Sequence, residues 1–159
     1  MPLLHPGDTF PDLDLHLPGN ESIGLPEALG GTFGIVLFNR GAWCPFCTAQ
    51  LRAFERAGHQ LRELGAAVVS LSVNDEATTK EMVTKNNITF LVGHSADAHQ
   101  VSQATGAFLN PDPVYLQATG FVLDPQGKVL VSAYSSGAIG RLTAEDTVGM
   151  IRYVTSAHA

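Results

Sequence analysis

The sequence predicts an α/β fold in which a mixed sheet forms the middle layer of a three-layer sandwich. Two apolar, β-branched runs, at 32–38 and 67–73, are each followed by residues in a helical pattern. Near the C-terminus, two further apolar runs flank the turn residues 124–127, and a last helical pattern follows. Parallel crossovers followed by an antiparallel pair and a closing helix produce this architecture. With 159 residues, we expect one domain, spanning 1–159.

Residues 13–17 alternate between leucine and polar side chains, as in a half-buried strand. Gly19 and Asn20 then form a turn, and Ile23 and Leu25 suit a short return strand. One helical turn over 25–29 precedes two glycines. The chain therefore begins with a predicted β-hairpin extension ahead of the central sheet.

The helical patterns are expected at four places along the chain. The first runs from Pro45 to Leu64 and stops at Gly65, and the second covers 76–85 with a cap at Asn74 or Asp75. A strand over 88–92 leads to a helix over 98–105 and then to a loop over 110–113. The last helix begins at Thr143, which has an acidic residue three positions later.

Composition excludes several classes of function. The net charge of −6 and the lack of a basic cluster argue against nucleic-acid binding. The longest apolar stretches, such as 35–38, are too short to cross a membrane. The first ten residues lack the charged start and apolar run of a signal peptide, so we expect a cytoplasmic protein.

The segment from Arg40 to Cys47 holds the two cysteines of the chain, spaced i and i+3. In the cytoplasm such a pair more often serves redox cycling or metal binding than a structural disulfide. There is no second cysteine pair, and the six histidines are scattered, which argues against zinc. Redox chemistry is therefore the preferred interpretation, with two inert buried cysteines as the alternative, and we expect neither a metal nor another cofactor.

A reactive cysteine needs a lowered pKa, because the thiolate is the nucleophile. Cys44 is expected at the start of a helix, where free N–H groups and the helix dipole stabilise a negative charge. Pro45 suits the first helical position, and Arg40 would add a positive charge unless it is simply a solvated strand-end residue. We expect Cys44 to be exposed and Cys47 to lie one turn further in, close enough to form a disulfide with it. Trp43 suits either the core or a wall beside Cys44.

These residues resemble the thioredoxin-like superfamily, and in particular the peroxiredoxin-like redoxins of the alkyl hydroperoxide reductase/thiol-specific antioxidant family. The opening 7–13, the strand 69–73 and the hairpin 121–129 are similar to the corresponding parts of that family. Trp43 followed by the two cysteines resembles thioredoxin, and Cys44-Pro45-Phe46-Cys47 resembles glutaredoxin. The resemblance implies a thioredoxin-like fold.

Two positions depart from the family pattern. Arg40 replaces the proline that precedes a peroxidatic cysteine by seven residues, and Ala118, followed by Thr119, replaces a thioredoxin cis-proline or a peroxiredoxin arginine. By analogy with thioredoxin, Cys44 attacks first. By analogy with peroxiredoxins, Cys47 attacks and Cys44 occupies a threonine position. The order of attack stays open.

The resemblance implies a thiol-dependent oxidoreductase that reduces peroxides through a reversible Cys44–Cys47 disulfide. Alternatives are a thioredoxin-like protein disulfide reductase and a non-enzymatic redox sensor. The expected partners are a peroxide or disulfide substrate and an external thiol reductant, such as a thioredoxin or glutathione system. Members of the family often form homodimers, although no exposed apolar stripe in this sequence requires one.

Overall fold

The structure, a computed structural model, describes residues 3–157. It contains nine strands, one 3₁₀ turn and five α-helices within that range. In chain order these are β1 (Leu13–Leu17), β2 (Glu21–Leu25), η1 (Glu27–Leu29), β3 (Phe33–Phe38), α1 (Pro45–Arg56), α2 (Gly58–Glu63), β4 (Ala66–Leu71), α3 (Glu76–Lys85), β5 (Leu91–Gly93), α4 (Ala98–Thr105), β6 (Leu109–Pro111), β7 (Val114–Leu116), β8 (Thr119–Leu123), β9 (Val129–Tyr134) and α5 (Ala144–Ala157).

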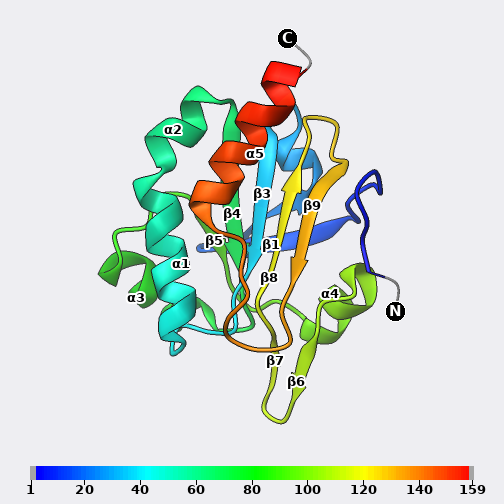
Figure 1. Cartoon of the computed structure of the whole chain (residues 1–159). Coiled ribbons are helices and arrows are strands. Elements are labelled where there is room, and N and C mark those ends of the chain that lie inside the picture. Colours follow the sequence, from blue (N-terminus) through cyan, green and yellow to red (C-terminus); the bar gives the residue numbers. More distant parts are fainter. Residues whose placement is uncertain (1–2, 158–159) are drawn as a thin grey trace.

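The central sheet has five strands in the order β5-β4-β3-β8-β9 (Figure 1). β3 is parallel to β4, and β4 is parallel to β5. β8 is antiparallel to both β3 and β9. β3 therefore lies in the middle of the sheet, as its apolar sequence predicts, and its carboxyl end leads directly to the two cysteines.

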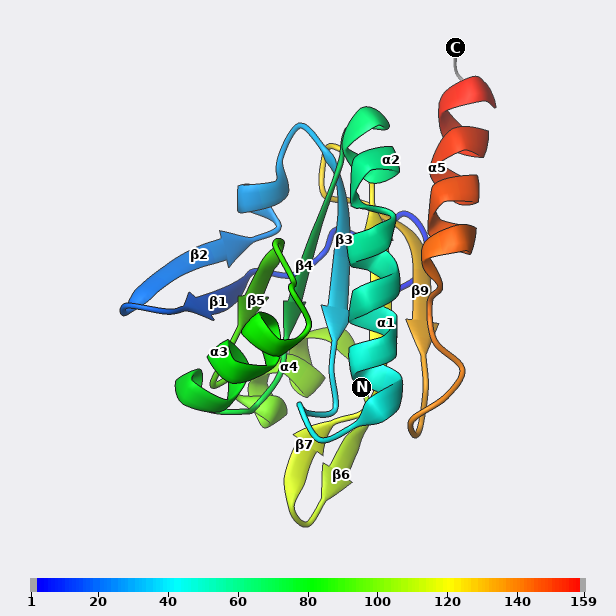
Figure 2. The ribbon, with the colours of Figure 1, turned by 90° about the vertical axis from the view of Figure 1, so that its left-hand side faces the viewer.

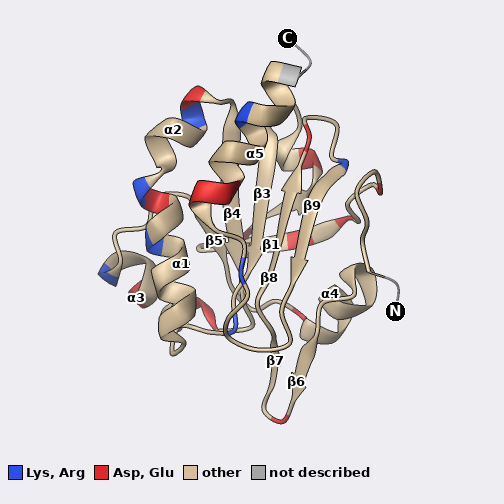
Figure 3. Ribbon diagram, in the orientation of Figure 1, with Lys and Arg blue, Asp and Glu red and all other residues tan. Residues whose placement is uncertain are grey.

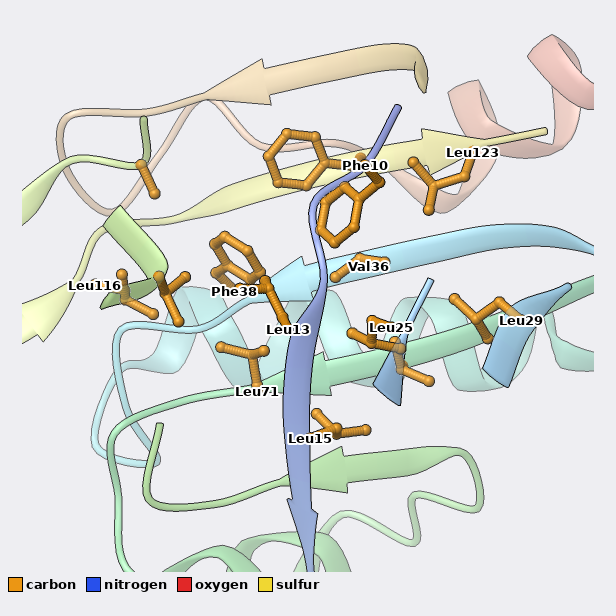
Figure 4. Packing of buried hydrophobic residues seen from close by; sticks show 14 of the residues in the cluster. Phe10, Leu13, Leu15, Leu25, Leu29, Val36, Phe38, Leu71, Leu116 and Leu123 are labelled. Atoms are coloured by element: carbon orange, nitrogen blue, oxygen red, sulfur yellow. The ribbon is translucent and has the colours of Figure 1, made fainter. Parts of the chain in front are cut away.

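The sheet separates two apolar cores. On one face, α1 and α5 cover the sheet (Figure 2). Side chains from α3 pack into the same core. On the other face lie the β1–β2 hairpin and α4. Figure 4 shows Leu13 and Leu15 of β1 close to Val36, Phe38 and Leu71 of the sheet. This arrangement confirms the predicted three-layer α/β sandwich with a mixed sheet and an N-terminal hairpin extension.

Several local predictions are confirmed in detail. Asp75 caps α3, because its side chain accepts a hydrogen bond from the backbone N–H of Thr78. α4 ends at Gly106 in the left-handed conformation, which glycine adopts without steric cost. The Thr143 hydroxyl accepts from the backbone N–H of Asp146 at 3.0 Å, at the start of α5. Each of these helix ends is encoded by residues close to it in the sequence, and the folded chain keeps it.

The expected single helix from Pro45 to Leu64 is wrong. The structure has two helices, α1 and α2, which are separated at Ala57. Gly58 follows that position, and glycine inside a helix is unfavourable because it loses much conformational freedom. Leu51, Phe54 and Leu61 all remain buried, so the apolar face continues across the break.

Two short regions also differ from the predictions. A strand is expected over 88–92, but the observed strand is β5, which begins only at Leu91. Asn86 and Asn87 form the turn that ends α3, and the backbone N–H of Ile88 still donates to the carbonyl of Val83 in that helix. The loop expected over 110–113 is the tip of a second hairpin, formed by β6 and β7. Strands of three residues are too short to show a period-two pattern.

Acidic and basic residues are intermixed along the outer surfaces of α1 and α2 (Figure 3). Over residues 3–157, no helix has the length and apolar character needed to cross a membrane.

Candidate active site

The two cysteines lie where the loop after β3 enters α1. Pro45 is the first residue of α1, and Cys44 is the residue that caps the helix, with an extended backbone. The backbone N–H groups of Cys47 and Thr48 both donate to the carbonyl of Cys44. The cysteines therefore stand at the N-terminal end of a helix, where unpaired N–H groups favour a thiolate.

Both cysteines are free thiols and both are buried. The exposed fraction is 0% for Cys44 and 1% for Cys47. The expected shielding of Cys47 is confirmed, but the expected exposure of Cys44 is wrong. The side chains of Arg40 and Arg141 both contact the Cys44 sulfur, and the cysteine spacing contains no information about Arg141.

Arg40 is one of these arginines. Its Nη1 lies 3.6 Å from Cys44 Sγ, its Nε donates to Gln117 Oε1 at 2.9 Å, and its Nη2 donates to the Tyr115 hydroxyl at 3.1 Å. Its guanidinium also lies over the rings of Trp43 and Tyr115, at 5.1 and 5.4 Å. Arg40 is thus a fixed cation beside Cys44, which excludes the interpretation as a solvated strand-end residue.

Arg141 is the second arginine, and no sequence pattern predicted its place at the site. Its Nη2 lies 2.9 Å from Cys47 Sγ and 3.7 Å from Cys44 Sγ. Its other nitrogens donate to Gln50 Oε1 at 2.8 Å and to the Ala138 carbonyl at 2.5 Å. It belongs to the loop between β9 and α5, 94 residues from Cys47, so that only the folded chain brings it to the sulfurs.

The environment shifts the pKa values of the two thiols in opposite directions. Burial opposes ionisation of Cys44, but hydrogen bonds from Cys47 and Arg40 and the charge of Arg141 outweigh it, so its pKa is lowered. Burial raises the pKa of Cys47; the charge of Arg141 opposes this, and the hydrogen bond that Cys47 donates to Cys44 adds to it. Although Arg141 lies nearer to Cys47, that thiol sits one turn deeper, and the opposite pKa shifts favour Cys44 as the first of the two thiols to ionise.

Two aromatic side chains next to the cysteines are exposed. Trp43 is 56% exposed and Phe46 is 52% exposed. Trp43 packs edge-on against Tyr115, with ring centroids 5.1 Å apart. Gly41 allows this position, since a Cβ there would lie 2.1 Å from the indole nitrogen. Trp43 is therefore a wall beside the site and does not belong to the core.

Thr119 lies in β8, where its hydroxyl donates to the carbonyl of Gln117 at 3.0 Å. Thr119 therefore anchors the backbone of Gln117, whose side chain accepts a hydrogen bond from Arg40. Ala118, between them, is buried.

A mainly apolar groove of about 370 Å³ lies beside Arg141. Phe46, Ile139 and Leu142 line its walls, and Gln50 and Arg141 line it on the side of the cysteines. Arg141 connects this groove to the reactive atoms because it contacts both sulfurs.

No group of three or more histidine, cysteine or acidic side chains is placed to hold a metal ion in the described range. What the site offers is two thiols close together, a helix terminus and two cations. A thioredoxin-like fold that carries such a dithiol after its central strand defines the class of thiol oxidoreductases.

Comparisons with known proteins agree with this class. The profile of the AhpC/TSA family matches residues 6–132. A peroxiredoxin of Methanothermobacter thermautotrophicus is 30% identical over 158 residues, which cover 96% of this chain and 73% of the relative. A peroxiredoxin of Chlorobaculum tepidum is 27% identical over 147 residues, covering 89% of this chain and 67% of the relative.

Solved structures show the same fold. AhpC of Mycobacterium tuberculosis superposes with a TM-score of 0.79 at 21% identity, covering 98% of this chain and 96% of that one. Reduced Prx3 of Vibrio vulnificus, solved in complex with hydrogen peroxide, gives a TM-score of 0.82 at 20% identity, with 94% and 99% covered. The chain belongs to the AhpC/TSA family, and its activity is the thiol-dependent reduction of peroxides.

Proposed function

We propose that this protein reduces peroxides through a reversible disulfide between Cys44 and Cys47, and that Cys44 attacks first. The observation that carries the proposal is the contact of one guanidinium nitrogen, Arg141 Nη2, with both sulfurs. The two thiols share one charged environment, and the lowered pKa of Cys44 makes it the better nucleophile. Pro45 begins the helix that orients the pair, and Trp43 shields it on one side.

The chemistry balances in two steps. The Cys44 thiolate attacks one peroxide oxygen, so that an S–O bond forms, the O–O bond breaks, and an alcohol or water leaves after taking up a proton. The thiol of Cys47 then displaces water from the resulting sulfenic acid and forms the disulfide. Arg40 and Arg141 stabilise the negative charge that develops on the departing oxygen.

Burial of the sulfurs favours a peroxide over a protein disulfide as the oxidising substrate. With Cys44 0% and Cys47 1% exposed, a large disulfide substrate would have to displace Arg40 or Arg141 before it met either sulfur. A peroxide is much smaller and needs far less room beside the sulfurs. The donor of electrons would be an external thiol reductant, such as a thioredoxin or glutathione system, and the place of action the cytoplasm.

The single cysteine variants test the order of attack. Cys47→Ser should form a sulfenic acid at Cys44 that a dimedone probe traps after one equivalent of hydrogen peroxide, while turnover falls at least a hundredfold. Cys44→Ser should consume little peroxide. Sulfenic acid trapped at Cys47 in Cys44→Ser, with none at Cys44 in Cys47→Ser, would reverse the order. Survival of both thiols in the wild type would remove the whole proposal.

A further inference from the structure

The reduced dithiol, formed by Cys44 and Cys47, receives four hydrogen-bond contacts from three nitrogen atoms. Arg141 Nη2 faces both sulfurs, at 2.9 Å from Cys47 and 3.7 Å from Cys44. Arg40 contributes Nη1 to Cys44 at 3.6 Å and its backbone N–H to Cys47 at 3.2 Å. Hydrogen bonds of this kind are strongest when the acceptor carries a negative charge. They therefore stabilise the thiolate, which exists only in the reduced form.

Neutral groups hold both guanidiniums in place. Gln117 and Tyr115 accept from Arg40, and Gln50 and the carbonyl of Ala138 accept from Arg141. Over residues 3–157, the ion pairs are His59–Glu63 and His94–Glu76, so neither arginine is paired with a carboxylate. Two part-buried positive charges thus face a dithiol that carries one negative charge once its first thiol has ionised.

Oxidation removes that charge. A disulfide is neutral and its sulfurs are weak acceptors, so Arg40 and Arg141 are left beside it in a partly desolvated place without a counter-charge. A disulfide becomes a stronger oxidant when its reduced form is selectively stabilised. The same uncompensated charges attract an anion to the oxidised site, and burial of the sulfurs restricts that anion to a small molecule.

From this geometry we infer that the Cys44–Cys47 disulfide is strongly oxidising and takes its electrons from a small anionic thiol of the glutathione class. The inference rests on the peroxide-driven disulfide proposed above and names its electron donor. One donor thiolate attacks a sulfur and forms a mixed disulfide, and one protein thiolate leaves. A second donor thiolate then attacks the donor sulfur of that mixed disulfide. Two donor molecules lose two electrons and become one disulfide, and the protein regains its dithiol with two protons.

The equilibrium with glutathione tests the redox part. The protein is incubated in buffers of varied ratio of reduced to oxidised glutathione, quenched with acid and alkylated, and its dithiol fraction is measured by mass. In Arg40→Met and in Arg141→Met, the equilibrium constant for reduction should fall about tenfold or more, about 30 mV for each factor of ten. Arg141→Lys keeps the charge and should fall less. Arg152→Met removes an exposed positive charge on α5, far from the sulfurs, and should match the wild type.

Tyr115→Phe provides a milder variant that tests the same idea. It removes the hydroxyl that holds Arg40 and leaves the arginine itself, so Tyr115 is a positioning residue whose loss should lower the same constant by a smaller factor. If circular dichroism shows that either methionine variant is unfolded, Tyr115→Phe and Arg141→Lys still test the redox part. An unchanged or increased constant in the folded variants would overturn the redox part.

The rate of reduction tests the charge of the donor. The second-order rate constant with glutathione should fall as sodium chloride is raised from about 20 to 500 mM, while the constant with neutral 2-mercaptoethanol should stay nearly constant. Equal salt dependence, or reduction by a thioredoxin and not by glutathione, would overturn the proposed donor. If peroxide forms no Cys44–Cys47 disulfide at all, the proposed function fails. This outcome differs from failure of the proposed donor, in which the disulfide forms but glutathione does not reduce it as expected.

Discussion

At the scale of single residues, the site depends on an asymmetry between two similar thiols. Cys44 caps the helix and has a lowered pKa, whereas Cys47 lies one turn deeper and has a raised pKa. Since Cys47 donates its proton toward Cys44, the two ionisations are linked and belong to the pair. The first ionisation leaves one thiolate, which is the form that attacks a peroxide.

This asymmetry predicts that the first thiolate of each chain forms at a pH below the ordinary thiol pKa. Thiolate absorbance at 240 nm should rise in a first step worth one thiolate, followed by a second step above the ordinary pKa. In Cys44→Ser, the low step should disappear. The disulfide form of the wild type serves as the blank. A single step worth two thiolates near the ordinary pKa would contradict the assignment.

The sequence predicted that Cys44, Cys47 and Arg40 belong to one site, because all three lie within a segment of eight residues. It could not predict Arg141, Gln117 or Tyr115. Arg141 follows a glycine in an irregular loop, where no periodicity shows which way a side chain points. The burial of Cys44 was missed for the same reason, because the side chains that cover it come from distant segments.

At the scale of elements, the β1–β2 hairpin is attached to the edge of the central sheet by a close approach. The backbone N–H of His94 donates to the carbonyl of His16 at 2.9 Å, so β1 is linked to the chain just after β5. Gly93 lies beside Leu15, and a Cβ on Gly93 would come within 2.4 Å of the Leu15 methyl group. The apolar core on this face depends on that contact.

Gly93→Ala should therefore destabilise the fold by about 1–3 kcal/mol, the usual cost of overpacking a core. Urea unfolding followed by circular dichroism measures the change. Gly24→Ala is the matched control, because a Cβ at Gly24 in β2 meets no atom within 4 Å. Equal stability of the two variants would mean that the hairpin shifts to make room at little cost.

The elements that the sequence predicted best are those with a complete local signal. The helix over 98–105 has a capping aspartate at its start and a glycine at its end, and the structure has the same bounds. The hairpin of β8 and β9 has a Pro/Gly turn between two apolar runs. By contrast, β6 and β7 are three residues long, and the division between α1 and α2 does not interrupt the apolar face, so hydrophobic spacing could reveal neither.

At the scale of the whole molecule, the charge at the active site is coupled to the stability of the fold. A thiol whose pKa is lower in the folded than in the unfolded state adds stability above its unfolded pKa, and this stability is lost as the pH falls through the folded pKa. The disulfide form has no such group. A four-residue disulfide loop also restricts the unfolded chain only slightly.

The reduced protein should therefore unfold at a higher temperature than the disulfide form at a pH close to the ordinary thiol pKa. The difference should shrink as the pH falls through the lowered pKa of Cys44. Differential scanning calorimetry of both forms across this range measures it, and Arg141→Met should reduce the difference. A disulfide form that is more stable at every pH would contradict this linkage.

Trp43 is the one tryptophan of the chain, and it lies in contact with the groups that respond to oxidation. Its ring is under the guanidinium of Arg40, and that guanidinium also reaches the sulfur of Cys44. Formation or loss of the thiolate changes the electric field at the indole, and indole emission is sensitive to such fields. The protein consequently carries its own optical probe, through which each half of the catalytic cycle can be followed by stopped flow without a dye or a coupled enzyme.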